Sequence, residues 1–193
     1  MAFGRQLFAV PVVGMNKPDD NKLMERCIKG DRQAFEKLLI RYEKPVYNAA
    51  YRMLHNPDDA RDVTQAVFLK VYEHLDQYDP SRRFFSWIYR ITLNESINWL
   101  KKSSREEALE NETADKTSGP EQQADNARIS EGLQAALMTI KSDYRSVIVL
   151  KHVLGCSYAE ISEVLDISEK KVKSRLYNAR KMLQERLTDQ GLH

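Results

Sequence analysis

Residues 157–187 have the sequence SYAEISEVLDISEKKVKSRLYNARKMLQERL, which contains two helix starts separated by a short turn. Ser157 and Glu160 match a capping box, in which each side chain bonds the backbone N–H of the other residue at the start of a helix. The short helix that follows gives way to a turn at residues 166–167, and Ser168 is then placed to cap a long second helix. Two helices joined by a tight turn predict a helix-turn-helix.

The apolar and charged residues of this stretch fall on different sides of the two helices. The residues expected to lock the helices together are Ile161, Leu165, Ile167, Val172 and Leu176. The outward face carries the candidate DNA-binding residues Ser168, Lys170, Lys171, Lys173, Ser174, Arg175, Tyr177, Asn178, Arg180 and Lys181. Long basic side chains bind phosphates and guanine edges, and Asn and Ser reach base edges. A solvated charged face is the alternative, but the capped helix, turn and basic helix together favour recognition of duplex DNA.

A second unusual stretch, RRFFSWIYRITLN at residues 82–94, interleaves aromatic rings with arginines. Single-stranded DNA is bound by this combination, because rings stack on bases and cations contact the backbone. The candidate residues for melted DNA are Arg82, Arg83, Phe84, Trp87, Tyr89, Arg90, Asn94 and Lys101. The Asn94 amide could hydrogen-bond the edge of an extruded base. Trp87 lies at helical spacing with neighbouring isoleucines, which is more typical of a hydrophobic core, and Phe84 and Phe85 fit either role.

The first block of the chain, residues 19–102, has the pattern of several amphipathic helices. Apolar residues recur every three or four positions at Ala60, Val63, Val67, Val71 and Leu75. Asp31 and Asn56 are placed to cap two of the helices, whereas Pro45 predicts a break or kink within a third helical stretch.

The middle of the chain, residues 103–128, is acidic and nearly free of apolar side chains. Such a segment cannot build a hydrophobic core, so we expect a flexible linker. Residues 1–18 are expected to form a disordered N-terminal extension. The sequence therefore predicts an all-α fold with two small helical domains, residues 19–102 and 129–189, joined by a flexible acidic linker.

Composition narrows the classes of function. The chain has 193 residues, of which 42% are hydrophobic and 30% charged, and its net charge of +2 does not by itself indicate nucleic-acid binding. Cys27 and Cys156 lie far apart and the histidines are scattered, so no metal site, cofactor or catalytic residue is expected. No segment is long and apolar enough to cross a membrane, and residues 1–14 lack the pattern of a signal peptide, so we expect a cytoplasmic protein.

Taken together, these stretches resemble the sigma factors of the extracytoplasmic-function (ECF) group of the sigma-70 family. The sequence DDARDVTQAVFLKVY at residues 58–72 resembles the helix by which this family binds the polymerase clamp. FSWIYRI at residues 85–91, with Asn94, resembles its minus-ten-binding helix. Residues 157–183 resemble its minus-thirty-five-binding helix-turn-helix, and the whole resemblance covers nearly everything from residue 21 to residue 187.

The resemblance implies a non-enzymatic subunit of RNA polymerase, built from a sigma-2 helical bundle and a sigma-4 helix-turn-helix domain. The first domain would bind the clamp of the largest subunit of core RNA polymerase through Asp58, Asp62, Gln65 and Leu69. It would also capture a flipped base of the melted minus-ten strand. The second domain would sit on the flap of the second-largest subunit and bind the minus-thirty-five duplex. The linker would follow the RNA exit path, and an anti-sigma factor would be a further partner.

Two places depart from the family pattern. Ala66 stands where the family usually has Glu, so one polar contact with the clamp is expected to be missing. Arg82 and Arg83 occupy a loop that often holds Gly and small polar residues. Because this loop selects the flipped base in the family, we expect a promoter motif that differs from the common one.

Two other classes of function compete with this hypothesis. A homodimeric helix-turn-helix regulator would bind a palindrome, but it leaves the aromatic-basic stretch unexplained. A pure interaction module, such as a sigma mimic that occupies an anti-sigma factor, would need no DNA contact. Charge reversal at Lys173 and Arg175 would leave such a module working, whereas it would impair a DNA-binding protein.

Overall fold

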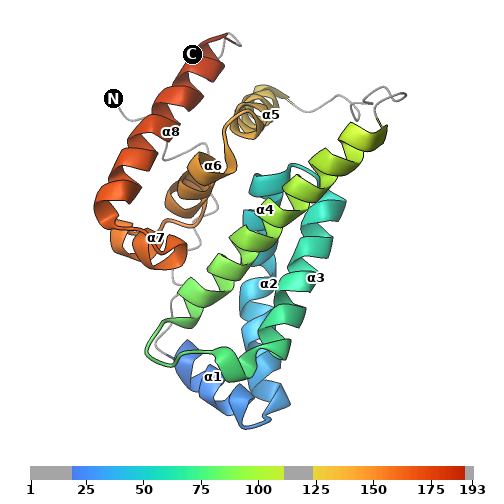
Figure 1. Cartoon of the computed structure of the whole chain (residues 1–193), viewed down its shortest axis with the longest axis vertical. Coiled ribbons are helices and arrows are strands. Elements are labelled where there is room, and N and C mark those ends of the chain that lie inside the picture. Colours follow the sequence, from blue (N-terminus) through green and yellow to red (C-terminus); the bar gives the residue numbers. More distant parts are fainter. Residues whose placement is uncertain (1–18, 111–123, 190–193) are drawn as a thin grey trace.

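The structure is a computed structural model, and it describes residues 19–110 and 124–189. Every regular element in these residues is a helix, as the all-α prediction requires (Figure 1). The elements in chain order are α1 (Asp20–Ile28), α2 (Arg32–Leu54), α3 (Pro57–Glu73), η1 (Leu75–Gln77), α4 (Phe84–Glu110), α5 (Ala124–Met138), α6 (Ser142–Ile148), the π-helical turn η2 (Val149–Val153), α7 (Tyr158–Leu165) and α8 (Glu169–Asp189). The predicted N-terminal extension and the middle of the predicted linker lie outside the described residues.

Three of the predicted helix starts are confirmed by their capping hydrogen bonds. The Asn56 side chain accepts from the backbone N–H groups of Asp58 and Asp59 at 2.9 and 3.2 Å, which begins α3. Asp31 accepts from Ala34 and begins α2. In the capping box of α7, the N–H of Ser157 donates to the Glu160 carboxylate at 2.8 Å. These are local interactions, so sequence spacing alone predicts them.

Two helices run further than predicted. Of the break or kink predicted at Pro45, the break is absent, because α2 continues through the buried Pro45 to Leu54 although proline removes one backbone hydrogen bond. Buried residues on both sides of it, such as Tyr42 and Ala49, hold the helix in place. Helix α4 runs on to Glu110, past the predicted end at residue 102, because extending an existing helix needs no new nucleation.

The first four helices form one bundle in which α2 contacts α1, α3 and α4. Its hydrophobic core contains three aromatic rings that meet edge to face. The Tyr42 ring lies 5.0 Å from the Phe84 ring and 6.4 Å from the Tyr89 ring, between centroids. Edge-to-face contacts of this kind add about 0.5–1.5 kcal/mol to the effect of burial. The start of α4 is thereby fixed against α2.

The last helices form the predicted helix-turn-helix, with α7 and α8 joined at Asp166. Asp166 adopts the left-handed conformation, with φ of 55°, which ends α7. Ser168 then accepts a hydrogen bond from the N–H of Lys171 and starts α8. Val172 and Leu176 are buried under the motif, as predicted.

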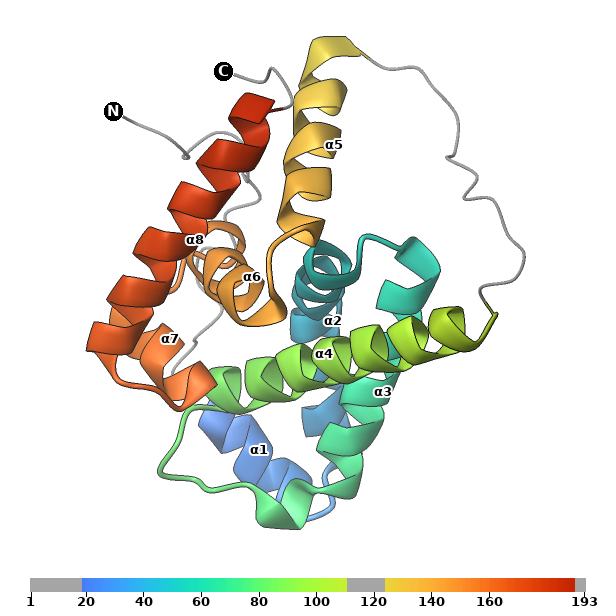
Figure 2. The same ribbon diagram turned by 45° about the horizontal axis from the view of Figure 1, so that its top comes forward.

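The two halves of the chain pack against one another rather than standing apart. Helix α7 lies on the first turns of α4, and α5, α6 and η2 lie on α2 (Figures 1 and 2). At the α2 side, the guanidinium of Arg145 donates to the carbonyl of Met53 at the end of α2. Arg52 donates to the Gln134 side chain at 3.0 Å and accepts from it through its carbonyl at 3.1 Å.

A buried carboxylate ties α1 to α2 inside the first bundle. Asp20 is only 1% exposed, and it accepts a hydrogen bond from the Tyr42 hydroxyl at 2.6 Å. Arg41 forms an ion pair with the same carboxylate. Burial, followed by the contact with Asp20, raises the pKa of Tyr42, so the hydroxyl stays protonated and remains a donor.

Replacing Tyr42 by Phe should destabilise the protein, because a buried carboxylate loses one of its donors while the ring packing is retained. We expect the free energy of unfolding to fall by about 1–3 kcal/mol. Urea denaturation followed by circular dichroism measures it. Tyr72→Phe is the matched control, since the Tyr72 side chain is 55% exposed and should lose little. Equal effects of the two substitutions would contradict this role of Tyr42.

Candidate nucleic-acid interface

The loop before α4 is held by Asn21, a residue that the sequence motifs do not mark. The Asn21 amide donates to the carbonyl of Arg82 at 3.0 Å, and its oxygen accepts from the backbone N–H of Phe84 at 3.1 Å. The Tyr78 hydroxyl bonds both the Asn21 oxygen and the Arg82 carbonyl, at 2.9 and 2.8 Å. This network fixes the direction in which α4 begins. It joins residues some 60 positions apart, so no local pattern could have predicted it.

Three of the four aromatic residues of the predicted minus-ten stretch, Phe84, Phe85 and Tyr89, are buried inside the bundle. Phe84 and Tyr89 are fully buried, so the prediction that their rings stack on bases is corrected: they belong to the hydrophobic core. Trp87 is half-buried, and its ring lies 5.2 Å from the Tyr78 ring and 6.2 Å from the Phe84 ring. This packing agrees with the core role that the helical spacing of Trp87 indicates, and stacking of its ring on a base stays a prediction.

The polar residues of the same stretch reach the surface. Arg82, Asn94 and Lys101 are exposed along α4 and its preceding loop, whereas Arg83 and Arg90 are half-buried. Arg83 forms ion pairs with Glu160 at 3.2 Å and Glu163 at 2.6 Å, both on α7.

Arg90 of α4 also contacts α7. It donates to the carbonyls of Glu163 and Val164, at 2.7 and 3.1 Å. Burial of Glu163 acts to raise its pKa, but hydrogen bonds from Arg83 outweigh it and leave the pKa below the ordinary value. Glu163 is therefore charged near neutral pH, as the ion pair with Arg83 requires.

The cations of α8 form the second exposed surface. Lys170, Lys171 and Lys173 are all exposed on its first turns. The other predicted duplex-binding residues with exposed side chains are Ser168, Ser174, Tyr177, Arg180 and Lys181. Arg175 and Asn178 are half-buried, and Arg175 donates to the Asp143 carboxylate at 2.8 Å. The first turns of α8 thus present a basic surface of the kind that enters a major groove.

The outward side of α3 is a third surface and carries the residues predicted to bind polymerase. Asp58, Asp62 and Gln65 are exposed, and the Leu69 side chain is 58% exposed. Tyr72, one turn further, is also exposed and packs edge to face on Phe35. Apolar side chains flanked by acidic groups fit an interface with another protein.

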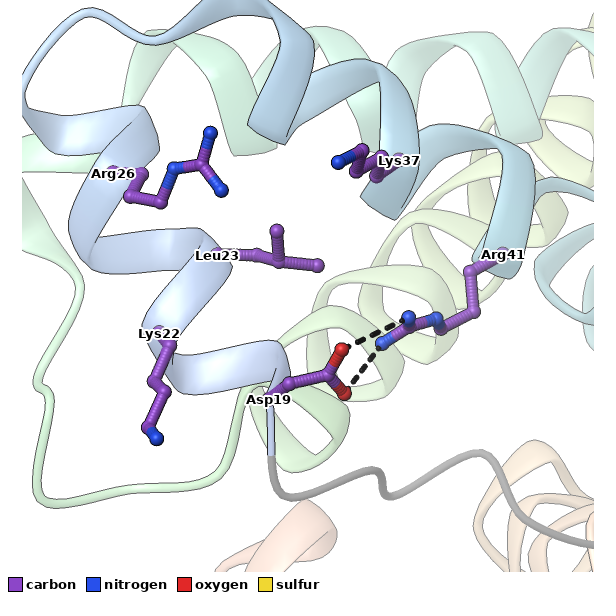
Figure 3. Close-up of a pocket in the computed structure, with 6 residues that line it drawn as sticks. All are labelled: Asp19, Lys22, Leu23, Arg26, Lys37 and Arg41. Carbon is purple, nitrogen blue, oxygen red and sulfur yellow. Dashed lines mark hydrogen bonds and ion pairs between the residues drawn. The ribbon is translucent and has the colours of Figure 1, made fainter.

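A surface pocket of about 350 Å³ lies between α1 and α2 (Figure 3). Its lining residues are Asp19, Lys22, Leu23, Arg26, Lys37 and Arg41. Arg41 is bound to Asp19 and Asp20, and Arg26 donates to Asp31 at 2.6 Å. Two of the lining cations are therefore neutralised within the chain, and no sequence motif marks the pocket as a site.

Among residues 19–110 and 124–189, no group of His, Cys, Asp and Glu side chains is arranged to hold a metal ion. Cys27 and Cys156 are buried free thiols, and burial raises the pKa of Cys156 to about 12. No helix in the same part of the chain has the length and apolar character needed to span a bilayer.

Comparison with known protein families matches each half of the chain to a region of the sigma-70 family. The model of Sigma-70 region 2 matches residues 38–106, which include most of α2, all of α3 and most of α4. The model of Sigma-70, region 4 matches residues 130–183, from α5 into α8.

Curated relatives match along nearly their whole length. The ECF RNA polymerase sigma factor SigW of Bacillus subtilis is 32% identical over 181 residues, which cover 87% of this chain and 96% of SigW. The ECF RNA polymerase sigma-E factor of Escherichia coli K12 is 33% identical over 184 residues, which cover 87% of this chain and 94% of the relative.

Solved structures share the fold. CnrH, in complex with the cytosolic domain of CnrY, superposes with a TM-score of 0.67 at 28% identity, over 88% of this chain and 97% of CnrH. The sigma factor RpoE of Bartonella quintana, in complex with the anti-sigma factor NepR, gives a TM-score of 0.65 at 22% identity, over 80% and 96% of the two chains. With region 2 and region 4 models matching in order, and curated relatives a third identical along its length, this chain belongs to the ECF group of the sigma-70 family and is an RNA polymerase sigma factor that directs promoter-specific transcription.

Proposed function

We propose that this sigma factor binds the clamp of the largest polymerase subunit through the outward side of α3. The exposed Leu69 supplies the apolar centre, and Asp62 and Gln65 supply polar contacts around it. The half-buried Ala66 offers no polar group to this surface, so the clamp contact rests on its neighbours. Asp58 contributes at the edge, where it already pairs with Arg61 at 2.9 Å.

The helix-turn-helix docks on the flap of the second-largest subunit and places α8 in the major groove of the minus-thirty-five duplex. The observation that carries this proposal is the exposure of Lys170, Lys171 and Lys173 on the first turns of α8, within region 4. Cations at these positions bind phosphates, and Ser174 and Asn178 are placed to contact base edges.

The minus-ten element is captured by the polar side of α4 rather than by its aromatic residues. Asn94 and Lys101 are exposed on that side, and Arg82 is exposed in the preceding loop. The Asn94 amide hydrogen-bonds the edge of a flipped base, and the cations contact the strand. Contacts with melted DNA offset the cost of unstacking, which is a few kcal/mol per flipped base.

Family membership supports two further features. Sigma factors are generally initiation factors without enzymatic activity, so we assign this chain no reaction of its own and place it in the cytoplasm with its polymerase. An anti-sigma factor is proposed as a partner, as RpoE has in its complex with NepR. The predicted path of the linker along the RNA exit route falls on residues that the structure describes only in part.

Lys173→Glu should reduce promoter-specific run-off transcription by core polymerase at least about tenfold, because a carboxylate replaces a cation facing the phosphates. A reconstituted assay with core polymerase, the purified chain and a library of promoter fragments measures this loss. Lys29→Glu is the charge-matched control on an exposed turn of the first domain, and it should keep full activity. If the wild-type chain directs no specific transcript but shifts duplex DNA as a dimer, the homodimeric regulator becomes the better explanation.

Asn94→Ala should impair opening of the promoter more than its initial binding, because the amide is proposed to act on a flipped base. We expect a loss of about tenfold in open complexes, detected as permanganate-reactive thymines, with little change in duplex binding by the holoenzyme. Gln33→Ala removes an exposed amide from α2 and should leave both unchanged. A loss confined to duplex binding would contradict the proposed role of Asn94.

Leu69→Ser should weaken binding to core polymerase about tenfold, or about 1.4 kcal/mol, since the side chain is the apolar centre of the proposed contact. The Kd is measured by fluorescence anisotropy with a labelled chain. Ile40→Ser is the matched control, because Ile40 is 76% exposed on α2 and lies outside the proposed surface. Equal Kd values for Leu69→Ser and the wild type would exclude α3 as the clamp-binding helix.

A further inference from the structure

Two cations of the proposed duplex-binding surface, Lys173 and Arg180, lie on the same side of α8. They are two helical turns apart, at positions i and i+7, so their side chains leave the helix in nearly the same direction. Both residues are exposed. Each of them nevertheless contacts a residue outside α8, namely His152 in the case of Arg180 and Tyr158 in the case of Lys173.

The contact between Arg180 and His152 is a hydrogen bond to a neutral imidazole. Arg180 donates from Nε to the Nε2 nitrogen of His152 at 3.3 Å, and its Nη2 nitrogen lies 3.3 Å from the same atom. A guanidinium has only donors, so Nε2 of His152 carries the lone pair and Nδ1 carries the proton. Burial, followed by the charges of Arg180 and Lys151, lowers the pKa of His152 to about 4, which keeps the imidazole neutral near pH 7.

The contact between Lys173 and Tyr158 is an attraction between a cation and an aromatic ring. The Lys173 ammonium lies 5.6 Å from the centre of the Tyr158 ring, and the Lys151 ammonium lies 5.0 Å from the same centre. The negative face of an aromatic ring attracts cations at these distances. Lys151 is held in addition by the Cys156 carbonyl, to which it donates at 2.9 Å. Tyr158 thus restrains the end of Lys173, which is a long and exposed side chain.

His152 belongs to the π-helical turn η2, and the backbone around this turn is well supported. Three of its five residues are buried in the hydrophobic core. The N–H groups of Leu154 and Cys156 donate to carbonyls within the turn, at 3.1 and 3.0 Å, which joins η2 to the loop before α7. Tyr158 follows this loop as the first residue of α7. Both contacting residues therefore stand on ordered backbone, whereas their partners on α8 are long side chains with many rotamers.

Neither contact neutralises the cation that it holds. An imidazole and a phenol ring carry no net charge, and Nη1 of Arg180 takes no part in the contact with His152. Arg175 differs, because it donates to the Asp143 carboxylate at 2.8 Å and so already has an anionic partner. A neutral partner fixes the direction of a cation and leaves its charge for a phosphate, whereas a carboxylate competes with the phosphate.

We propose that His152 and Tyr158 are positioning residues for duplex binding, which hold Arg180 and Lys173 in the directions that the DNA phosphates require. The proposal rests on the proposed function of α8, and it adds two residues that lie outside α8 and act through its cations. A side chain that is already ordered loses less conformational entropy when it binds. The geometry of the basic surface is thus set in part by η2 and the first residue of α7.

The test measures the Kd of the holoenzyme, reconstituted from core polymerase and full-length variants, for a labelled duplex promoter chosen in the run-off assay. His152→Leu removes the acceptor and should weaken binding about fivefold, within the cost of immobilising one long side chain. His152→Gln supplies an amide oxygen as acceptor and should stay within about twofold of the wild type. His74→Leu is the matched control, because His74 is exposed in the first domain and bonds Gln77 instead.

The Tyr158 arm of the test follows the same design. Tyr158→Leu removes the aromatic face and should weaken binding about fivefold, for the same reason. Tyr158→Phe keeps the ring and should stay within about twofold of the wild type.

Double-mutant cycles separate positioning from a general effect on the fold. In the Arg180→Ala background, His152→Leu should change the Kd by less than about twofold, because the cation through which it acts is absent. Tyr158→Leu should behave in the same way in the Lys173→Ala background. Nuclear magnetic resonance of the chain should show the Nε–H of Arg180 protected from exchange with water in the wild type and in His152→Gln, but not in His152→Leu.

The proposal is overturned if either leucine substitution leaves the Kd unchanged, or if it weakens binding equally with and without its cation. In the second case the residue supports the fold alone. The proposed function is judged by the single substitutions Arg180→Ala and Lys173→Ala. If these weaken binding, α8 contacts the duplex whatever the cycles show, and if they do not, both the contact and the positioning role are excluded.

Discussion

The arrangement of the two domains depends on the buried guanidinium of Arg145. A buried charge must be fully hydrogen-bonded, and Arg145 meets this requirement with carbonyls from the end of α5, from the α5–α6 turn and from the end of α2. The acceptors come from both domains, so moving the domains apart would deprive the group of a partner. Arg145 thus joins the two domains through hydrogen bonds to both.

The proposed binding surfaces differ in whether their side chains are exposed or already bonded within the chain. Apolar and acidic groups on α3 face outward, and so do the cations at the start of α8. Arg83, just before α4, pairs instead with the carboxylates of Glu160 and Glu163, and Arg90 of α4 donates to backbone carbonyls of α7.

Much of the fold could be predicted from the sequence, because its signals are local. The caps at Asn56, Ser157 and Ser168 depend on atoms within three residues of each other, and the structure has them all. The roles of the aromatic residues of α4 were harder to predict. Phe84 and Tyr89 have the composition of a stacking surface, but both are buried. Only tertiary packing decides between these roles.

The covering of Arg83 and Arg90 could not have been predicted at all. Arg83 and its partner Glu163 are separated by 80 positions, and each belongs to a motif that is complete without the other. The role of Asn21 was hidden in the same way, because it bonds the carbonyl of Pro80, 59 positions away, only once α1 packs beside the loop before α4. Sequence patterns identify the faces of helices, whereas the choice of which two faces meet is made by the whole chain.

The double use of Arg83 links two properties that selection would otherwise adjust separately. It stands in the loop that we propose contacts promoter DNA, and it also takes part in the contact between the two halves of the chain. A substitution of Arg83 that changes which promoters are favoured would therefore also weaken the contact between α7 and the start of α4. Drift in promoter preference within such a lineage would have to be accompanied by change at positions 160 and 163, so the two regions are expected to co-evolve even though they belong to separate domains.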